Sequence, residues 1–353
     1  MIRKKLTKKE QNTLWSLINY PTLNDKALAK KTRLNLSTIT AIRRRFREKG
    51  YYQTVNIPNF YRLGYELLSV EYGPLNEAVP IEKRIKQFKD FMENDPNSIF
   101  SLMSRSNGIV LNIAKNYAEA NQHYEKLEMF FTAHDLTDET GWKKAIFPFQ
   151  TSLFWNFFDY SPVIRYSYDI KRKINLQEFS SDKDTRVVKL SKKEKKVLYG
   201  LVRYPEESDN RIADRFGVSR QAVSNIKKRF RKEDLLSTRK IMNFEYTGCN
   251  LLTFGYTFFG TRAPIDMRKN GLDYTKKSLP TFLGISSNFE NITFMATKNY
   301  LDYEKLKEKL LSFYKTHLSM PKPPEILLFP VEDLYYRKNP TFHKLLGKIV
   351  GME

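Results

Sequence analysis

Cysteine is almost absent from this chain of 353 residues, which contains only Cys249. A single cysteine cannot close a disulfide within the chain, so the sequence predicts no disulfide framework and favours a reducing, cytoplasmic environment. We expect Cys249 to be a small core residue, since a free cysteine behaves mostly as a buried hydrophobe.

Histidine is also scarce, and the four histidines are His123, His134, His317 and His343. None is spaced with another histidine or with the cysteine as metal ligands are. Glycine-rich phosphate loops and nucleophile elbows are missing as well. The sequence therefore predicts no metal, no cofactor and no enzymatic activity.

Long hydrophobic runs are missing too. No segment approaches the roughly 20 apolar residues of a membrane span, and the first seven residues carry charges with no apolar stretch behind them. We expect neither a signal peptide nor a membrane partner. The expected location is the cytoplasm, in association with the nucleoid.

Negative charge is scarce in two segments of the chain. Residues 1–62 hold 15 Lys and Arg against 3 Asp and Glu, and residues 187–247 hold 16 against 8, so together they account for +20 of the net +22. A basic field confined to two segments points to a polyanion, with nucleic acid first and an anionic membrane surface second.

The same two segments are copies of one another, about 184 residues apart. Leu6–Pro21 aligns without a gap on Leu190–Pro205, and half of the aligned positions are identical. The same alignment continues beyond this stretch, and it matches Gly64 with Gly248. A duplicated unit much longer than about 50 residues indicates a tandem pair of domains and not a solenoid.

Each copy opens with three amphipathic helices and a turn, followed by residues that favour strands. Asn35 and Ser219 are the expected caps of the two third helices, which bury Ile39, Ile42 and Phe46 in the first copy. Three helices followed by a small hairpin predict a winged helix-turn-helix.

The remainder of each half reads strand, helix, strand, strand, helix, strand, the order of the ferredoxin-like split βαβ. The expected fold class is therefore α+β, a tandem repeat of two winged helix-turn-helix domains and two ferredoxin-like domains. A final segment carries a short C-terminal helix. The expected domains are 1–62, 63–150, 151–186, 187–247, 248–332 and 333–353, of which 151–186 and 333–353 fall outside the repeat.

Segment 151–186 begins apolar and ends in a polar linker at residues 180–184. The aromatic run Phe147–Tyr160 is expected in a core or an oligomer interface, and its alternative role is to stack bases or bind a partner.

The candidate functional residues lie on the outward faces of the two third helices. A helix fits the major groove, where residues of its first turns reach base edges, while basic residues further along suit phosphates. The predicted DNA-binding residues are Ser37, Thr38, Thr40, Ala41, Arg43, Arg44 and Arg47 in the first copy, and Arg220, Gln221, Ser224, Asn225, Lys227, Lys228 and Arg231 in the second.

The two helices differ in what they present to DNA. Arg220, Gln221 and Asn225 can make paired hydrogen bonds to bases, whereas the first helix is poorer in such side chains. We expect the second copy to contribute more specificity and the first copy more general affinity, and a target with two unequal half-sites.

The winged helix, the Leu63-Gly64-Tyr-Glu-Leu-Leu-Ser-Val junction and the following βαββαβ order resemble the Lrp/AsnC, or feast/famine, transcription regulators. The resemblance covers nearly all of both halves. It implies a ferredoxin-like RAM domain that pairs through its sheet, hence self-association as a dimer or a pseudo-dimer within one chain. It also implies an archaeal or bacterial source.

A small-molecule effector is less firmly implied, since the strand hairpins at Ser104–Gly108 and Ser286–Asn291 lack the family's usual glycine and aspartate. Some proteins of this two-domain plan are siroheme decarboxylases, and the basic helices argue for DNA instead.

The function predicted from the sequence is a sequence-specific regulator that binds double-stranded DNA. The alternative within nucleic-acid binding is a low-specificity chromatin or nucleoid protein, which the net charge favours. The remaining hypotheses are a siroheme-decarboxylase-like enzyme and a protein–protein scaffold.

Overall fold

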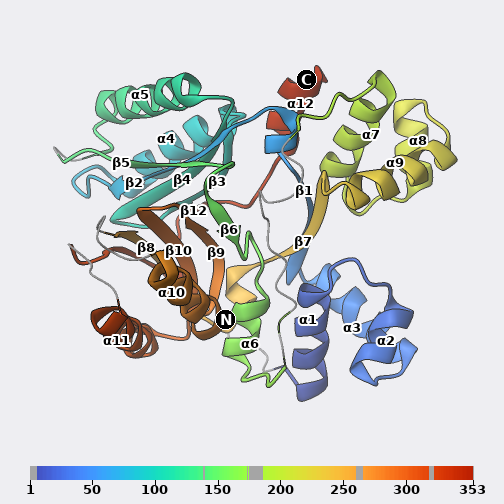
Figure 1. Ribbon diagram of the computed structural model, residues 1–353, viewed down its shortest axis with the longest axis horizontal. Coiled ribbons are helices and arrows are strands. Elements are labelled where there is room, and N and C mark those ends of the chain that lie inside the picture. The colour runs from blue at the N-terminus through green and yellow to red at the C-terminus, as the bar shows by residue number, and fades with distance from the viewer. Residues whose placement is uncertain are drawn as a thin grey trace. The chain divides into compact units, whose positions relative to one another are not determined.

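The computed structural model describes residues 6–137, 140–172, 174, 186–259, 265–317 and 322–352, with only the backbone described at 265–269 and 315–317. The chain forms two compact units (Figure 1). The first unit contains Met1–Gln53, Leu153–Ser180 and Arg239–Glu332, and the second contains Thr54–Ser152, Ser181–Thr238 and Asp333–Glu353.

The units do not follow the order of the repeat. The first unit joins the helix-turn-helix of the first copy to the ferredoxin-like domain of the second copy, and the second unit joins the opposite pair. A sequence repeat gives the order of similar segments but not which of them pack together, so this exchange comes from the tertiary structure.

The helices of both helix-turn-helix segments form as expected. Each first helix begins with a capping box, in which the side chain of Thr7 or Ser191 accepts from the backbone of the glutamate three residues on, and that glutamate reaches back to the cap. The helices are α1 (Lys8–Asn19), α2 (Asp25–Thr32) and α3 (Leu36–Glu48), and then α7 (Lys192–Arg203), α8 (Asp209–Phe216) and α9 (Arg220–Lys232).

The wing differs from the expected hairpin in each copy. Strand β1 (Tyr52–Pro58) and strand β7 (Leu236–Met242) pair with each other to make one two-stranded sheet. Each copy has a single run of strand-forming residues, and a short 3-10 turn follows it (Tyr61–Leu63 and Phe244–Tyr246). A hairpin needs two strands, so each wing strand finds its partner in the other copy.

In the second unit a five-stranded antiparallel sheet carries two helices (Figure 1). Its order is β12-β3-β4-β2-β5, in which the last four strands have the ferredoxin-like order. The elements are β2 (Leu67–Pro74), α4 (Ile81–Asn94), β3 (Ser98–Met103), β4 (Asn107–Ala114), α5 (Tyr117–Ala133), β5 (Lys143–Pro148) and β12 (Tyr336–Lys338).

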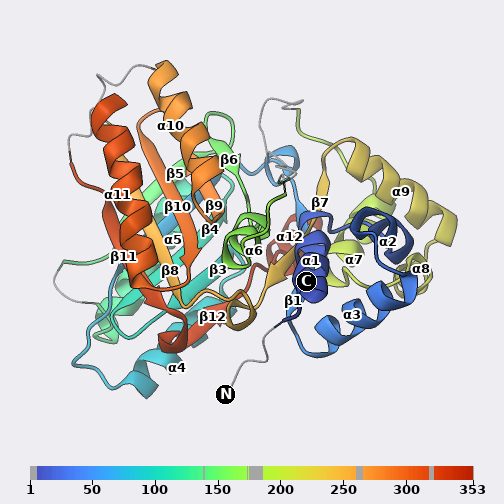
Figure 2. The same cartoon turned by 90° about the horizontal axis from the view of Figure 1, so that it is seen from below.

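The first unit repeats this arrangement with the order β11-β8-β10-β9-β6. Figure 2 shows its two helices lying side by side along the sheet. The elements are β8 (Leu251–Phe258), α10 (Ile265–Ser278), β9 (Thr281–Ser286), β10 (Glu290–Thr297), α11 (Tyr300–His317), β11 (Glu325–Pro330) and β6 (Leu153–Trp155). The α+β tandem of winged helix-turn-helix and ferredoxin-like domains is therefore confirmed.

The two segments that we placed outside the repeat are in fact equivalent. Each supplies an edge strand and a short helix: β6 with α6 (Ser161–Ser167), and β12 with α12 (His343–Val350). Helix α6 packs against α1 in the first unit, and α12 packs against α7 in the second. The sequence did not reveal this equivalence. Leu153-Phe-Trp155 and Tyr336-Arg-Lys338 both form edge strands, but their side chains differ in chemistry. The expected linker at 180–184 lies outside the described residues.

The aromatic run forms core. Phe147, Phe154, Phe158 and Tyr160 are all at most 1% exposed, and Tyr160 stacks on Phe282 with ring centroids 4.8 Å apart. Cys249 is also fully buried, as expected, and burial raises the pKa of its thiol to about 12. Within the described residues, no helix is both long and apolar enough to cross a membrane.

Candidate nucleic-acid interface

Helices α3 and α9 occupy the same place in their two helix-turn-helix segments. Both bury one side, with Ile39 and Phe46 at 0% exposure in α3 and Val223 and Phe230 at 0% in α9. The Ser219 hydroxyl caps α9 by accepting from the backbone N–H of Ala222 at 3.2 Å, whereas Asn35 stands at the cap of α3 without a side-chain hydrogen bond.

The opposite sides of both helices carry the residues predicted from the sequence, and none of them is buried. Exposed are Ser37, Thr40, Ala41, Arg44, Arg47, Arg220, Gln221, Asn225, Lys228 and Arg231, while Thr38, Arg43, Ser224 and Lys227 are half-buried. The Gln221 amide donates to the Asn225 side-chain oxygen at 3.2 Å, so these two side chains on successive turns orient each other. Their contact with bases remains a prediction.

Arg43 and Lys227, at equivalent positions, turn back to the domain. Arg43 Nε lies 2.9 Å from Asp25 Oδ1, an ion pair without hydrogen-bond alignment, and its Nη2 donates to the Leu23 carbonyl at 2.7 Å. Lys227 Nζ lies 2.8 Å from Asp209 Oδ1. In each copy the basic residue thus ties the third helix to the start of the second.

The third residue of each basic triplet is also used within the domain. Arg45 pairs with Glu10, and Arg229 Nη1 lies 2.5 Å from Glu194 Oε1. Partial burial works against ionisation of Glu10, but hydrogen bonds from Thr7 and the Arg45 charge lower its pKa. The sequence did not reveal these pairs, because acid and base lie 35 residues apart.

The middle residues, Arg44 and Lys228, are left at the surface. The one ion pair described for Arg44 is with Glu48 at 3.8 Å, with both side chains mostly exposed, and such pairs contribute little. These residues suit contact with phosphates, while their neighbours hold the helix in place.

The different roles of the paired and the exposed basic residues can be tested. Arg44→Ala with Lys228→Ala is expected to lower DNA affinity and reduce the slope of log affinity against log salt by about 1 per residue, with the unfolding free energy nearly unchanged. The matched pair Arg43→Ala with Lys227→Ala is expected to lose about 1 kcal/mol of stability at each position. Chemical unfolding and fluorescence anisotropy measure both quantities, and the same loss of salt slope from both pairs would contradict the assignment.

A second polar site lies inside the ferredoxin-like domain of the second unit and was missed by the sequence analysis. Glu71 on β2 is fully buried, with hydrogen bonds from Ser69 at 2.8 Å and from Asn112. His123 on α5 lies between two carboxylates, with Nε2 2.6 Å from Asp95 Oδ2 and Nδ1 3.9 Å from Glu71 Oε2.

Burial and the neighbouring charges shift the pKa values of Glu71, Asp95 and His123 in opposite directions. Burial raises the pKa of Glu71, against the lowering effect of His123. Burial opposes charge on His123, but the Asp95 hydrogen bond and the Glu71 charge raise its pKa. Burial opposes ionisation of Asp95, yet His123 lowers its pKa. A groove of about 590 Å³ borders His123 and Asp95. In the described part of the chain no three metal-ligating side chains gather to hold a metal ion.

The fold and the helices define this chain as a tandem protein of winged helix-turn-helix and ferredoxin-like domains. No family model and no curated protein matches the chain. It is similar to two structures of the siroheme decarboxylase NirDL, one in complex with an iron-uroporphyrin III analogue, at 10% and 11% identity and TM-scores of 0.53 and 0.54. Each match covers 97% of this chain and 98% or 99% of the other. An AsnC family regulator from Agrobacterium tumefaciens covers 40% of this chain and 90% of its own, at 17% identity and a TM-score of 0.33.

The prediction that this chain is not an enzyme is contradicted by the NirDL comparison. The tandem plan, along the whole chain, is one that an enzyme has. Short catalytic motifs and basic helices do not decide the question, because a catalytic site can be assembled from residues far apart in the chain. At 10% identity the likeness establishes the fold.

Proposed function

We propose that the chain is a sequence-specific regulator that binds double-stranded DNA through α3 in one unit and α9 in the other. The observation that carries this is the shared construction of the two helices. Each buries its apolar side, is tied to its domain by two ion pairs at equivalent positions, and presents polar and basic residues outward.

The charge of the chain supports the same conclusion. The two segments that hold these helices carry nearly all of the net charge of +22. Basic side chains that neutralise phosphates release counterions, so they supply affinity for any sequence. Arg44, Lys228 and Arg231 are exposed and would serve this purpose.

Specificity would come from the first turns of the helices. In α9 the exposed Arg220 and Gln221 have the donors and acceptors that pair with guanine and adenine edges in the major groove. In α3 the corresponding positions are Leu36 and Ser37, and Leu36 is 50% exposed. An exposed leucine there offers only apolar contact, for example with a thymine methyl group.

The decisive experiment selects bound fragments from a random DNA pool and then measures affinity for the selected site and for unrelated DNA. We expect affinity for both to fall steeply between about 50 and 200 mM salt. We also expect the selected site to keep a preference of about 10³-fold or more.

Two other results would overturn the proposal. Steep salt dependence with no preferred site would indicate a low-specificity chromatin protein. If no DNA complex formed at low salt and iron uroporphyrin gave a shifted Soret band on addition, the result would indicate binding of a tetrapyrrole, as in the NirDL complex.

A further inference from the structure

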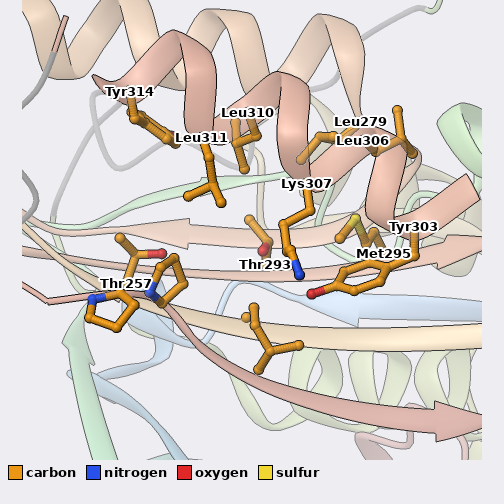
Figure 3. A pocket seen from close by; sticks show the side chains of 14 residues that line it. Thr257, Leu279, Thr293, Met295, Tyr303, Leu306, Lys307, Leu310, Leu311 and Tyr314 are labelled. Atoms are coloured by element: carbon orange, nitrogen blue, oxygen red, sulfur yellow. The ribbon is translucent and has the colours of Figure 1, made fainter. Parts of the chain in front are cut away.

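The ferredoxin-like domain of the first unit contains a cavity of about 260 Å³ between its sheet and helix α11. Figure 3 shows the side chains that line it. Its walls are mainly apolar and include Leu279, Met295, Leu306 and Leu310. The cavity is larger than the roughly 150 Å³ that holds a benzene molecule in an engineered apolar cavity.

The same space is filled in the other copy of the fold. There Trp142 packs so closely over Gly73 and Gly108 that a Cβ atom on either glycine would lie 2.7 or 2.6 Å from the indole. At the equivalent positions the cavity domain has Pro324 in place of the tryptophan, with Thr257 and Asn291 in place of the glycines. The bulk that closes one core is absent from the other.

The buried polar cluster of the first copy is replaced as well. In order along the chain, Gly255, Met295 and Leu306 stand where Glu71, Asn112 and His123 stand. All three replacements line the cavity. A cavity of this size is therefore no requirement of the fold. An empty one lowers stability through the contacts that its lining lacks.

The cavity also carries hydrogen-bond donors. Figure 3 shows the Lys307 ammonium and the Tyr303 hydroxyl directed towards each other inside it. Tyr303 is 2% exposed, and among the described residues its hydroxyl has no hydrogen-bond partner. Lys307 Nζ lies 2.7 Å from each carboxylate oxygen of Glu304, which positions the ammonium.

From this geometry we infer that the cavity binds a small amphipathic carboxylate, with its apolar chain among the leucines and its carboxylate between Lys307 and Tyr303. These two donors select an acceptor head group, and a charged acceptor makes the stronger hydrogen bonds. The apolar walls select a chain without polar substituents. This inference stands independently of DNA binding.

Calorimetric titration of the full chain with octanoate tests it, with octanol and acetate as comparison ligands. We expect saturable binding of octanoate, at least 10-fold tighter than either comparison ligand, and a higher melting temperature in its presence. Lys307→Met should weaken octanoate at least 10-fold and leave octanol unchanged. The control Lys309→Met, an exposed position on the same helix, should change neither.

Leu306→Trp is designed to fill the cavity. It should abolish binding of both octanoate and octanol and leave the circular dichroism spectrum unchanged. Equal affinity for octanol and octanoate would overturn the choice of head group. Octanoate binding that survives Lys307→Met unchanged, or no binding by a folded wild-type chain, would overturn the site.

Discussion

Replacing His123 by leucine is expected to lower the free energy of unfolding of the second unit by about 3–5 kcal/mol, because breaking a buried ion pair leaves its partner charge uncompensated. Leucine is the residue that the other copy has at the equivalent position, in a cavity whose described lining contains no carboxylate. Here Glu71 and Asp95 would both lose their cationic neighbour. Urea unfolding, followed by far-ultraviolet circular dichroism, measures the change.

A matched control is available at the C-terminal end of the same helix. His134 is half-buried, and its ring contacts only the Phe130 carbonyl at 2.8 Å among the hydrogen bonds described for it. His134→Leu is expected to cost less than about 1.5 kcal/mol. If His123→Leu cost no more than this control, the carboxylates would not depend on the imidazolium.

The stability difference between the wild type and His123→Leu should also depend on pH. The pKa of His123 is raised on folding, so the stabilisation from its proton is complete below its ordinary value of 6.5 and is lost as pH rises through the raised value. We therefore expect the difference to be largest near about pH 6 and to shrink at higher pH.

Other groups in the cluster titrate in their own windows. Glu71 acts in the same direction from lower pH, since its raised pKa favours the protonated form, whereas Asp95, with its lowered pKa, stabilises the fold above 3.8 and loses this as pH falls. Lys126 opposes the charge on His123, and burial lowers the pKa of Lys338, beside Asp95, to about 8. Comparing variant and wild type at each pH cancels the common part of these effects. A difference that grew above pH 7 would show the opposite sign of linkage.

The second large effect is expected in DNA recognition. Arg220→Ala with Gln221→Ala should raise the Kd for the selected site by about 10- to 100-fold per lost base contact, since a paired hydrogen bond to a base contributes about 1–3 kcal/mol of discrimination. Affinity for unrelated DNA should change only a few-fold. Both residues are exposed, so stability should stay within about 0.5 kcal/mol of the wild type.

The first copy provides the control. Ser37→Ala with Thr38→Ala removes the polar side chains from the first turn of α3, and we expect a smaller loss of preference for the selected site. A uniform weakening of all DNA sequences by the Arg220 and Gln221 variant would show that these residues contact phosphates and not bases.

Most secondary structure could be predicted from the sequence. Within the two repeated halves, the helices and strands follow the predicted order, whereas β6, α6 and β12 were not predicted. Local rules were sufficient here, because caps, periodicity and turn residues act within a few positions of one another.

The site could be predicted only in part. The outward residues of α3 and α9 follow from helical periodicity, and the structure leaves them unburied. That Arg43 and Lys227 would turn inward could not be predicted, because their acidic partners lie on a different helix. The cluster around His123 was missed for a similar reason, since Glu71 and His123 are 52 positions apart and meet only when α5 packs on the sheet.

The sequence by itself determined the duplication, the order of helices and strands, and the concentration of positive charge in two segments. These are properties of composition and of short-range pattern. The tertiary structure alone decided that β6 and β12 join the sheet of the opposite copy, that the wing strands pair with each other, and that one ferredoxin-like core is filled while the other holds a cavity. Such choices depend on which surfaces bury one another, and two nearly equivalent copies offer more than one way to pair the same segments.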